Sequence, residues 1–165
     1  MTAPAKVRSY QYIARPYDRV RAAFHQKGSL LIQTATRAAS ARADDIGSTL
    51  HFVAKGFDVG VDVKIRVDEA HDEQAVTLNS PVTRLKLGWQ AVRNTSLFPQ
   101  LEGTLSAWPL SATETQIEIE GTYTPPLGAV GQALDALLLH RIAEAAVHRF
   151  VEDVVEQLRR DVRAS

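Results

Sequence analysis

The sequence predicts an α+β fold in which a curved antiparallel sheet wraps around one long C-terminal helix. Between residues 59 and 124, several segments alternate apolar and polar side chains, which is typical of half-buried antiparallel strands. After Pro125 and Pro126 the pattern becomes helical over roughly 30 residues, far above the average helix length. Strands grouped before a long helix place the helices on one face of a sheet, and the length fits a single domain covering residues 1–165.

The N-terminal part predicts a strand, a short helix and a second strand. Residues 6–13 (KVRSYQYI) are rich in aromatic and β-branched residues, as strands are. In residues 14–27 (ARPYDRVRAAFHQK), Pro16 suits the first turn of a helix, and Val20 and Phe24 follow a helical spacing. Residues 30–42 (LLIQTATRAASAR) combine a strand-like start with an alanine-rich end, and we expect a strand there.

The clearest alternation lies in the centre of the chain. In residues 59–68 (VGVDVKIRVD), valine and isoleucine point one way and charged residues the other, which predicts a half-buried strand. Residues 48–57 (STLHFVAKGF) can pair with it across a bend that Gly56 and Gly60 permit. The charged residues 69–75 (EAHDEQA) then predict a turn.

Three later segments predict further strands: residues 83–92 (TRLKLGWQAV), 101–110 (LEGTLSAWPL) and 116–124 (QIEIEGTYT). The last strand ends at Pro125 because proline cannot donate a hydrogen bond to a neighbouring strand. Across the sheet, alternation places these residues on the inner face: Val61, Val63, Ile65, Leu85, Leu87, Trp89, Leu101, Leu105, Ile117, Ile119 and Tyr123. Since hardly any titratable group is among them, the charged side chains are expected to face water.

The predicted C-terminal helix, from about Val130, changes character along its length. Its later turns carry one apolar stripe, which is made of Ala143, Val147, Phe150, Val151, Val154 and Leu158. Its first turns are apolar on every side, with Leu134, Leu137, Leu138, Leu139 and Ile142. Because these side chains cannot all contact one sheet, we expect one side to cover a cavity, pack under a loop or form a homodimer contact.

Composition excludes several classes of function. The 19 basic residues balance 19 acidic ones, so no overall positive field attracts nucleic acid. The chain has no cysteine, and therefore no disulfide, thiolate zinc site or cysteine nucleophile. No apolar run of about 18 residues predicts an integral membrane segment, and the N-terminus lacks the apolar core of a secretory signal. We therefore expect a cytoplasmic protein.

Three segments together resemble a known family. They are YIARPYDRVRAAF at residues 12–24, LFPQLEGTLSAWPLSATETQIEIEGTYTPPLG at 97–128, and GQALDALLLHRIAEAAVHRFVEDVVEQL at 131–158. Their order resembles the START and Bet v 1-like superfamily, whose bacterial members are called SRPBCC or polyketide cyclase/dehydrase-like proteins. The resemblance spans essentially the whole chain and contains no catalytic signature. It implies a helix-grip fold and the binding of an apolar ligand in a cavity.

The predicted cavity lies between the sheet and the C-terminal helix. Ten residues are expected to line it: Val63, Ile65, Leu87, Trp89, Phe98, Leu105, Ile119, Tyr123, Leu134 and Leu138. Tyr123 is the one inward residue with an acidic proton, although buried tyrosines more often fill a core and find a local hydrogen-bond partner. Phe98, in a loop beside Pro99, either closes the cavity or plugs the edge of the core.

The sequence assigns no catalytic residue, no metal site and no cofactor. His140, Glu144 and His148 recur every four residues, but we interpret them as a solvated helix face with salt bridges, because no further ligands converge there. His25 and His51 are single, and His71 lies in the acidic segment 69–75. Gly128 and Gly131 precede a helix without the rest of a phosphate-binding motif, so close helix packing explains them better.

The favoured function is the binding or carrying of a hydrophobic small molecule, such as a lipid, polyketide or aromatic compound. One alternative is a polyketide cyclase-like or hydrolase-like enzyme in which Tyr123 and a cavity water transfer protons. Another is a ligand-free structural module that dimerises through the leucine-rich start of the last helix. A cavity of at least roughly 300 Å³ is expected of the first two.

Overall fold

The structure, a computed structural model, describes residues 4–49, 63–91, 100–124 and 136–161. In chain order the elements are β1 (Ala5–Ile13), α1 (Tyr17–Thr49), β2 (Val63–Val67), β3 (His71–Ala75), β4 (Ser80–Ala91), β5 (Gln100–Pro109), β6 (Thr115–Thr124) and α3 (Ala136–Asp161). The strands predicted at residues 6–13, 83–92, 101–110 and 116–124 are confirmed as β1, β4, β5 and β6. The strand expected at residues 48–57, with Gly56 and Gly60, falls mostly outside the described ranges.

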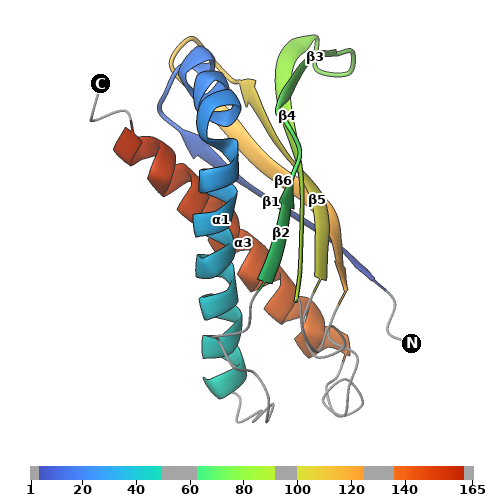
Figure 1. Cartoon of the computed structure of the whole chain (residues 1–165). Helices are drawn as coiled ribbons and strands as arrows, with labels where there is room; N and C mark the ends of the chain where they lie inside the picture. The colour runs from blue at the N-terminus through green and yellow to red at the C-terminus, as the bar shows by residue number, and fades with distance from the viewer. Residues whose placement is uncertain (1–3, 50–62, 92–99, 125–135, 162–165) are drawn as a thin grey trace.

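The strands form one six-stranded sheet in the order β1-β6-β5-β4-β2, with β3 also paired to β4. All the pairings are antiparallel. Register carries single rows of residues across the strands: Ser9 of β1 lies opposite Ile119 of β6, which lies opposite Leu105 of β5, which lies opposite Leu85 of β4. The predicted antiparallel sheet is thus confirmed, and it is curved (Figure 1).

Both long helices lie on the same face of this sheet (Figure 1). The C-terminal helix α3 packs mainly on β1 and β6, whereas α1 contacts β4, β5 and β2, and the two helices contact each other extensively. This segregation of helices to one face confirms the predicted α+β class and its long C-terminal helix. Within the described ranges, neither helix is long and apolar enough to cross a membrane.

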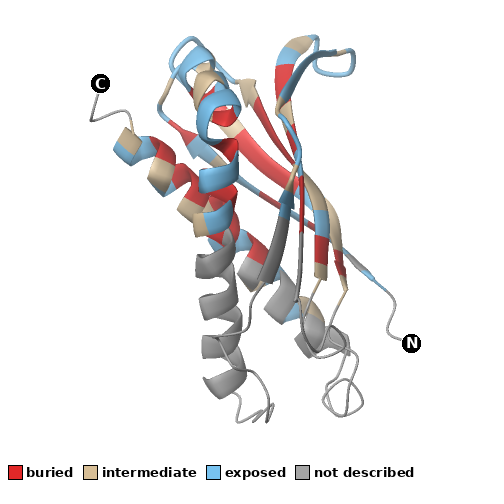
Figure 2. Ribbon diagram, in the orientation of Figure 1, coloured by how far each residue is buried: buried red, intermediate tan, exposed pale blue. Residues whose placement is uncertain are grey.

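The hydrophobic core fills the space between the helices and the inner face of the sheet (Figure 2). The described side chains of the predicted α3 stripe are buried there, including Val147, Phe150 and Val154, and α1 contributes Val20 and Phe24. Leu85, Leu101, Leu105, Ile117 and Ile119 are buried on the strands, as alternation predicts. The period of two on the strands and the helical period of α3 therefore identify the same core from opposite sides.

The strand expected at residues 30–42 is wrong, because α1 continues without a break from Tyr17 to Thr49. Leu31, Ile32 and Ala35 are buried, and their spacing of one and four residues matches one side of a helix. Gly28 does not end the helix either, since it brings α1 close to Leu85: a Cβ at Gly28 would lie 3.0 Å from a methyl group of Leu85. Contact with the core therefore decides the conformation of a segment whose sequence fits both structures.

The turn expected at residues 69–75 is also wrong. His71–Ala75 forms β3, which pairs with Ser80–Arg84 of β4 as a hairpin. The turn lies at residues 76–79 instead, where Asn79 has a φ of 45°, a left-handed conformation that asparagine tolerates better than most residues. Because β3 is held by backbone pairing and its side chains are mostly exposed, its sequence carries no apolar alternation.

Candidate functional site

The predicted interior site falls only partly within the described residues. Leu87, Leu105, Ile119 and Tyr123 are buried on the inner face of the sheet. For Val63, Ile65, Trp89 and Leu138 the structure describes only the backbone, and Phe98 and Leu134 lie outside the described ranges. Burial of the first four fits both a cavity wall and a packed core, so the lining role of all ten stays a prediction.

Register nevertheless brings several of the predicted residues together. Trp89 of β4 lies opposite Ile65 of β2 and Leu101 of β5, and Leu101 lies opposite Tyr123 of β6. This row stands at the end of the sheet where β6 leads toward α3. Of the side chains in this row that the structure describes, Leu101 and Tyr123 are both buried on the inner face, so an apolar wall with a phenol stands at this end.

Tyr123 is the polar group of this wall. Its side chain is almost completely buried, and burial raises the pKa of its phenol well above the usual value near 10. The phenol is therefore neutral at physiological pH. A neutral phenol is able to donate a hydrogen bond to a ligand, and it is unsuited to act as a general base.

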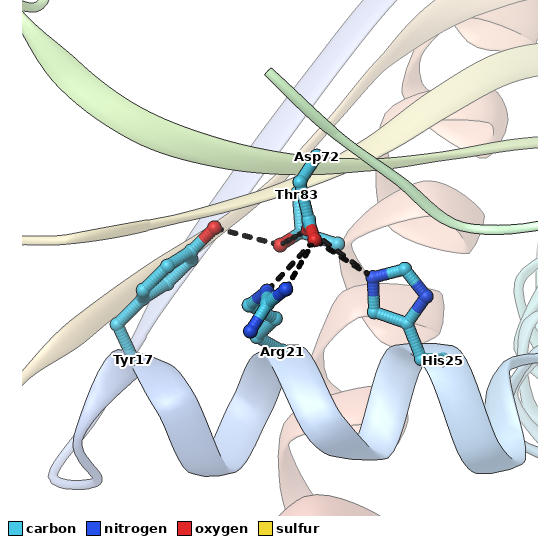
Figure 3. Close-up of polar contacts among 5 residues, drawn as sticks. All are labelled: Tyr17, Arg21, His25, Asp72 and Thr83. Carbon is cyan, nitrogen blue, oxygen red and sulfur yellow. Dashed lines mark hydrogen bonds and ion pairs between the residues drawn. The ribbon is translucent and has the colours of Figure 1, made fainter. Parts of the chain in front are cut away.

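A second group of polar residues, here called the Asp72 cluster and drawn in Figure 3, lies at the other end of the β4–β5 pairing from Trp89. It consists of Tyr17, Arg21 and His25 from α1, Asp72 from β3 and Thr83 from β4. Arg21 donates to Asp72 through Nε at 2.8 Å, with Nη2 at 2.7 Å, and His25 Nε2 lies 3.1 Å from Asp72 Oδ1. Asp72 thus joins the β3–β4 hairpin to the first turns of α1.

The hydrogen bonds of the Asp72 cluster have a definite direction. Thr83 Oγ1 donates to Asp72 Oδ1 at 2.7 Å, which uses the single hydrogen of this hydroxyl. Tyr17 must therefore donate to Thr83 Oγ1 across their 2.7 Å contact. The bonds from Arg21, followed by those from Thr83 and His25, hold the pKa of Asp72 far below its usual range, whereas burial raises the pKa of Tyr17.

The sequence contains a signal for this cluster that the prediction missed. Tyr17, Arg21 and His25 are spaced by four residues and therefore share one side of a helix. His25 looks single in the sequence because its partner Asp72 lies 47 residues farther along the chain. Once residues 71–75 are taken as a strand rather than a turn, that partner is brought next to α1.

A third polar contact joins β1 to α3. Ser9 Oγ lies 3.2 Å from His148 Nδ1, and His148 Nε2 lies 3.2 Å from Glu152 Oε1. If Glu152 accepts a hydrogen from Nε2, Nδ1 accepts one from Ser9, in the order of a serine, histidine and carboxylate relay. Ser9 is only 9% exposed, however, which leaves a substrate little access to its hydroxyl. The contact is best explained as an attachment of α3 to β1.

The remaining histidines of the described residues make exposed ion pairs. His140 lies 3.1 Å from Glu144 one turn away, as expected of a solvated helix face. Within the described ranges no group of three or more histidine, aspartate and glutamate side chains is placed to hold a metal ion.

A groove of about 670 Å³ lies on the outer face of the sheet, the face that carries no described helix. Such a hollow is explained by the twist of the strands, which gives each face of a sheet a saddle shape. One end of the groove is apolar, with Leu78, Val82 and Trp108. Val82 is only 1% exposed although it does not belong to the hydrophobic core, so the outer face carries a small apolar cluster of its own.

The middle of this groove is charged but internally neutralised. Arg8 donates to Glu118 at 2.9 Å, and Arg84 pairs with Glu73 and donates to Ser106 at 3.2 Å. Because both guanidinium groups already face carboxylates, they exert little attraction on an anionic ligand. We therefore regard the groove as a weaker candidate than the interior wall.

Comparison with known proteins gives similarity in overall structure alone. No protein-family model matches the chain, and no curated protein matches it. Several solved structures are similar, among them the Zhui aromatase/cyclase from Streptomyces sp. R1128, with 14% identity over 98% of both chains and a TM-score of 0.47. The hypothetical protein jhp0584 from Helicobacter pylori has 8% identity over 93% of this chain and 87% of that one, with a TM-score of 0.47. TTHA0849 from Thermus thermophilus has 14% identity over 98% of this chain and 99% of that one, with a TM-score of 0.42. Similarity this distant does not bear on the activity of this chain.

Proposed function

We propose that the chain acts as a single domain that binds or carries an apolar small molecule, such as a lipid, polyketide or aromatic compound, between the sheet and α3. The observation that supports this most is the apolar inner wall at the Tyr123 end of the sheet. There a neutral, buried phenol stands in one row with Leu101 and the backbone position of Trp89. A wall of this kind suits a ligand that is mostly hydrocarbon and has one hydrogen-bond acceptor.

We assign the ligand to this end because aromatic side chains fill the other end of the interior. Phe24 and Phe150 are fully buried there among the core residues of β4, β5 and β6. The end of α3 lies beside α1 near the Asp72 cluster, since Asp161 pairs with Lys27. The earlier turns of α3, which include Leu138, therefore run toward the Tyr123 end. The leucine-rich start of α3 then covers the ligand rather than more of the core.

Among the residues that the structure describes, the positions of the titratable groups favour binding over catalysis. The raised pKa of Tyr123 excludes it as a base near neutral pH. Asp72 contacts both His25 and Thr83. Thr83 is six residues from Trp89 on β4, so the two positions are roughly 20 Å apart at about 3.4 Å per residue. An enzyme would need an acid and a base near the same ligand. A carrier needs only burial: covering a few hundred Å² of apolar ligand surface contributes several kcal/mol at about 25 cal/mol per Å².

Native mass spectrometry tests this proposal. The purified protein, before and after incubation with stearic acid, is compared under gentle and denaturing conditions. We expect an added mass that is lost on denaturation and that is reduced in Leu138→Arg, because a charge in the apolar site is costly. Val76→Arg is the matched control, since Val76 is 93% exposed at the β3–β4 turn. The absence of added mass in every preparation, or equal binding by Leu138→Arg and wild type, would overturn the proposal.

A further inference from the structure

Strand β1 lies at an edge of the sheet. It pairs with β6 along all nine residues from Ala5 to Ile13, and no described strand pairs with its other side. The register has no interruption, and the strand contains neither proline nor glycine. An edge strand of this length presents a row of backbone N–H and C=O groups that can pair with another strand.

The outward side chains of β1 combine two cations with two aromatic residues. Lys6, Arg8, Tyr10 and Tyr12 alternate with the inward residues of the strand. Tyr10 is 50% exposed and Tyr12 is 48% exposed, and their ring centroids are 5.7 Å apart. Arg8 is also exposed, although it pairs with Glu118. Two neighbouring tyrosines that are exposed on this edge strand indicate a surface that a partner covers.

We propose that this edge binds a second copy of the chain, with β1 pairing antiparallel to β1 of that copy around a two-fold axis at Ser9. In this register Ala5 lies opposite Ile13 of the second copy, so all nine residues pair. Lys6 lies opposite Tyr12 of the second copy, and Arg8 lies opposite Tyr10. Each cation thus meets an aromatic ring, and cross-strand pairs of this kind stabilise a sheet.

The charges also select this register. Moving the two-fold axis to Arg8 would place two guanidinium groups opposite each other, which is unfavourable, and would leave the end of the strand unpaired. An axis at Ser9 and perpendicular to the sheet keeps the helices of both copies on the same face. The two six-stranded sheets then continue into each other, and the two α3 helices, which pack on β1, lie on either side of the axis. The surface is distinct from the leucine-rich start of α3.

The test is sedimentation velocity of the full chain over a wide range of concentrations, with variants that exchange the outward residues. Tyr10→Arg places Arg8 opposite a second arginine twice in each dimer, and we expect the dimer Kd to rise at least about tenfold. The double variant Arg8→Tyr with Tyr10→Arg restores a cation opposite an aromatic residue. It also keeps an intramolecular partner, because position 10 lies directly opposite Glu118. We expect this variant to dimerise like wild type.

Circular dichroism and thermal melting of each variant show whether it is folded. Leu30→Arg, at an exposed position of α1, is the matched control for an added surface charge and should leave the dimer unchanged. A wild-type chain that stays monomeric at all concentrations would overturn the proposal. So would a folded Tyr10→Arg variant that dimerises as tightly as wild type. Neither result depends on whether a ligand is bound in the interior.

Discussion

Gly103 of β5 and Gly121 of β6 lie directly opposite each other on the inner face of the sheet, and their backbones approach closely. A Cβ at Gly121 would lie 2.8 Å from the Cα of Gly103 and would clash with the carbonyl oxygen of Glu102. Backbone atoms cannot move away as a flexible side chain can. The two glycines therefore allow a close strand contact near the middle of the curved sheet.

The first prediction concerns this contact. Gly121→Ala should destabilise the protein by at least about 1 kcal/mol, because an added methyl group forces the two strands apart. Gly88→Ala is the matched control. A Cβ at Gly88 would lie 2.7 Å from the carboxylate of Glu102, but this carboxylate pairs with Arg66 at the surface and is free to move into solvent. We expect a change within about 0.5 kcal/mol for the control. Urea unfolding measures both, and equal costs would show that the strand contact is not constrained.

The second prediction concerns the closed end of the core. Phe150→Ala should lower the free energy of unfolding by roughly 3–5 kcal/mol, because the side chain is fully buried and its removal leaves a cavity. Val76→Ala, at a fully exposed position, should change it by less than about 0.5 kcal/mol. Thermal and urea unfolding provide the comparison. A small loss for Phe150→Ala would mean that this end of the interior is loosely packed.

The third prediction is a pH dependence that arises from Asp72. Its folded-state pKa is lowered, chiefly by the hydrogen bond from Arg21, below an unfolded value of about 3.9. The ionised carboxylate therefore stabilises the fold at neutral pH, and this contribution is lost as the pH falls from about 4 toward the folded-state pKa.

Asp72→Asn should consequently cost about 1 kcal/mol or less at pH 7, as for other partly exposed ion pairs, and progressively less below pH 4. Asp68→Asn is the control, since Asp68 is exposed and lies 4.0 Å from Arg66. Unfolding curves at a series of pH values give the difference from wild type. A difference that does not shrink in acid would contradict the assignment.

The fourth prediction uses the raised pKa of Tyr123. Burial favours the neutral phenol in the folded state, so its contribution to stability is complete below the unfolded pKa near 10 and is lost as the pH rises above that value. Tyr123→Phe should therefore unfold at a higher pH than wild type in alkaline titrations. Tyr12→Phe, at a half-exposed position, should follow wild type. An alkaline midpoint that is unchanged in Tyr123→Phe would show that the phenol ionises freely.

The sequence predicted the elements whose periodicity is created by the core itself. Leu85 and Leu87 on β4, Ile117 and Ile119 on β6, and the α3 stripe around Phe150 all repeat with the period of the element that buries them. The predictions from the sequence were wrong where contacts with other elements decide the local conformation. Residues 71–75 form a strand because β4 supplies backbone partners, and residues 30–42 stay helical because Leu31, Ile32 and Ala35 meet the core.

The periodicity of the sequence also did not predict the long-range polar contacts. The spacing of Tyr17, Arg21 and His25 was visible, but Asp72 became a partner only through the hairpin that the sequence did not predict. For the interior site, alternation correctly placed Leu87, Leu105, Ile119 and Tyr123 on the inner face, because one buried face fixes the register of a strand. Alternation does not reveal whether a buried residue contacts protein or ligand.

The most direct test of the proposed interior site uses the two tryptophans of the chain. Trp89 occupies an inner-face position opposite Leu101, whereas Trp108 lines the groove on the outer face. The variants Trp108→Phe and Trp89→Phe each keep one of them, and a dibrominated stearic acid quenches tryptophan fluorescence only at short range. Saturable quenching in Trp108→Phe, with none in Trp89→Phe, is the result expected of a ligand between sheet and α3. Quenching confined to Trp89→Phe would place the ligand in the outer groove and contradict the interior site.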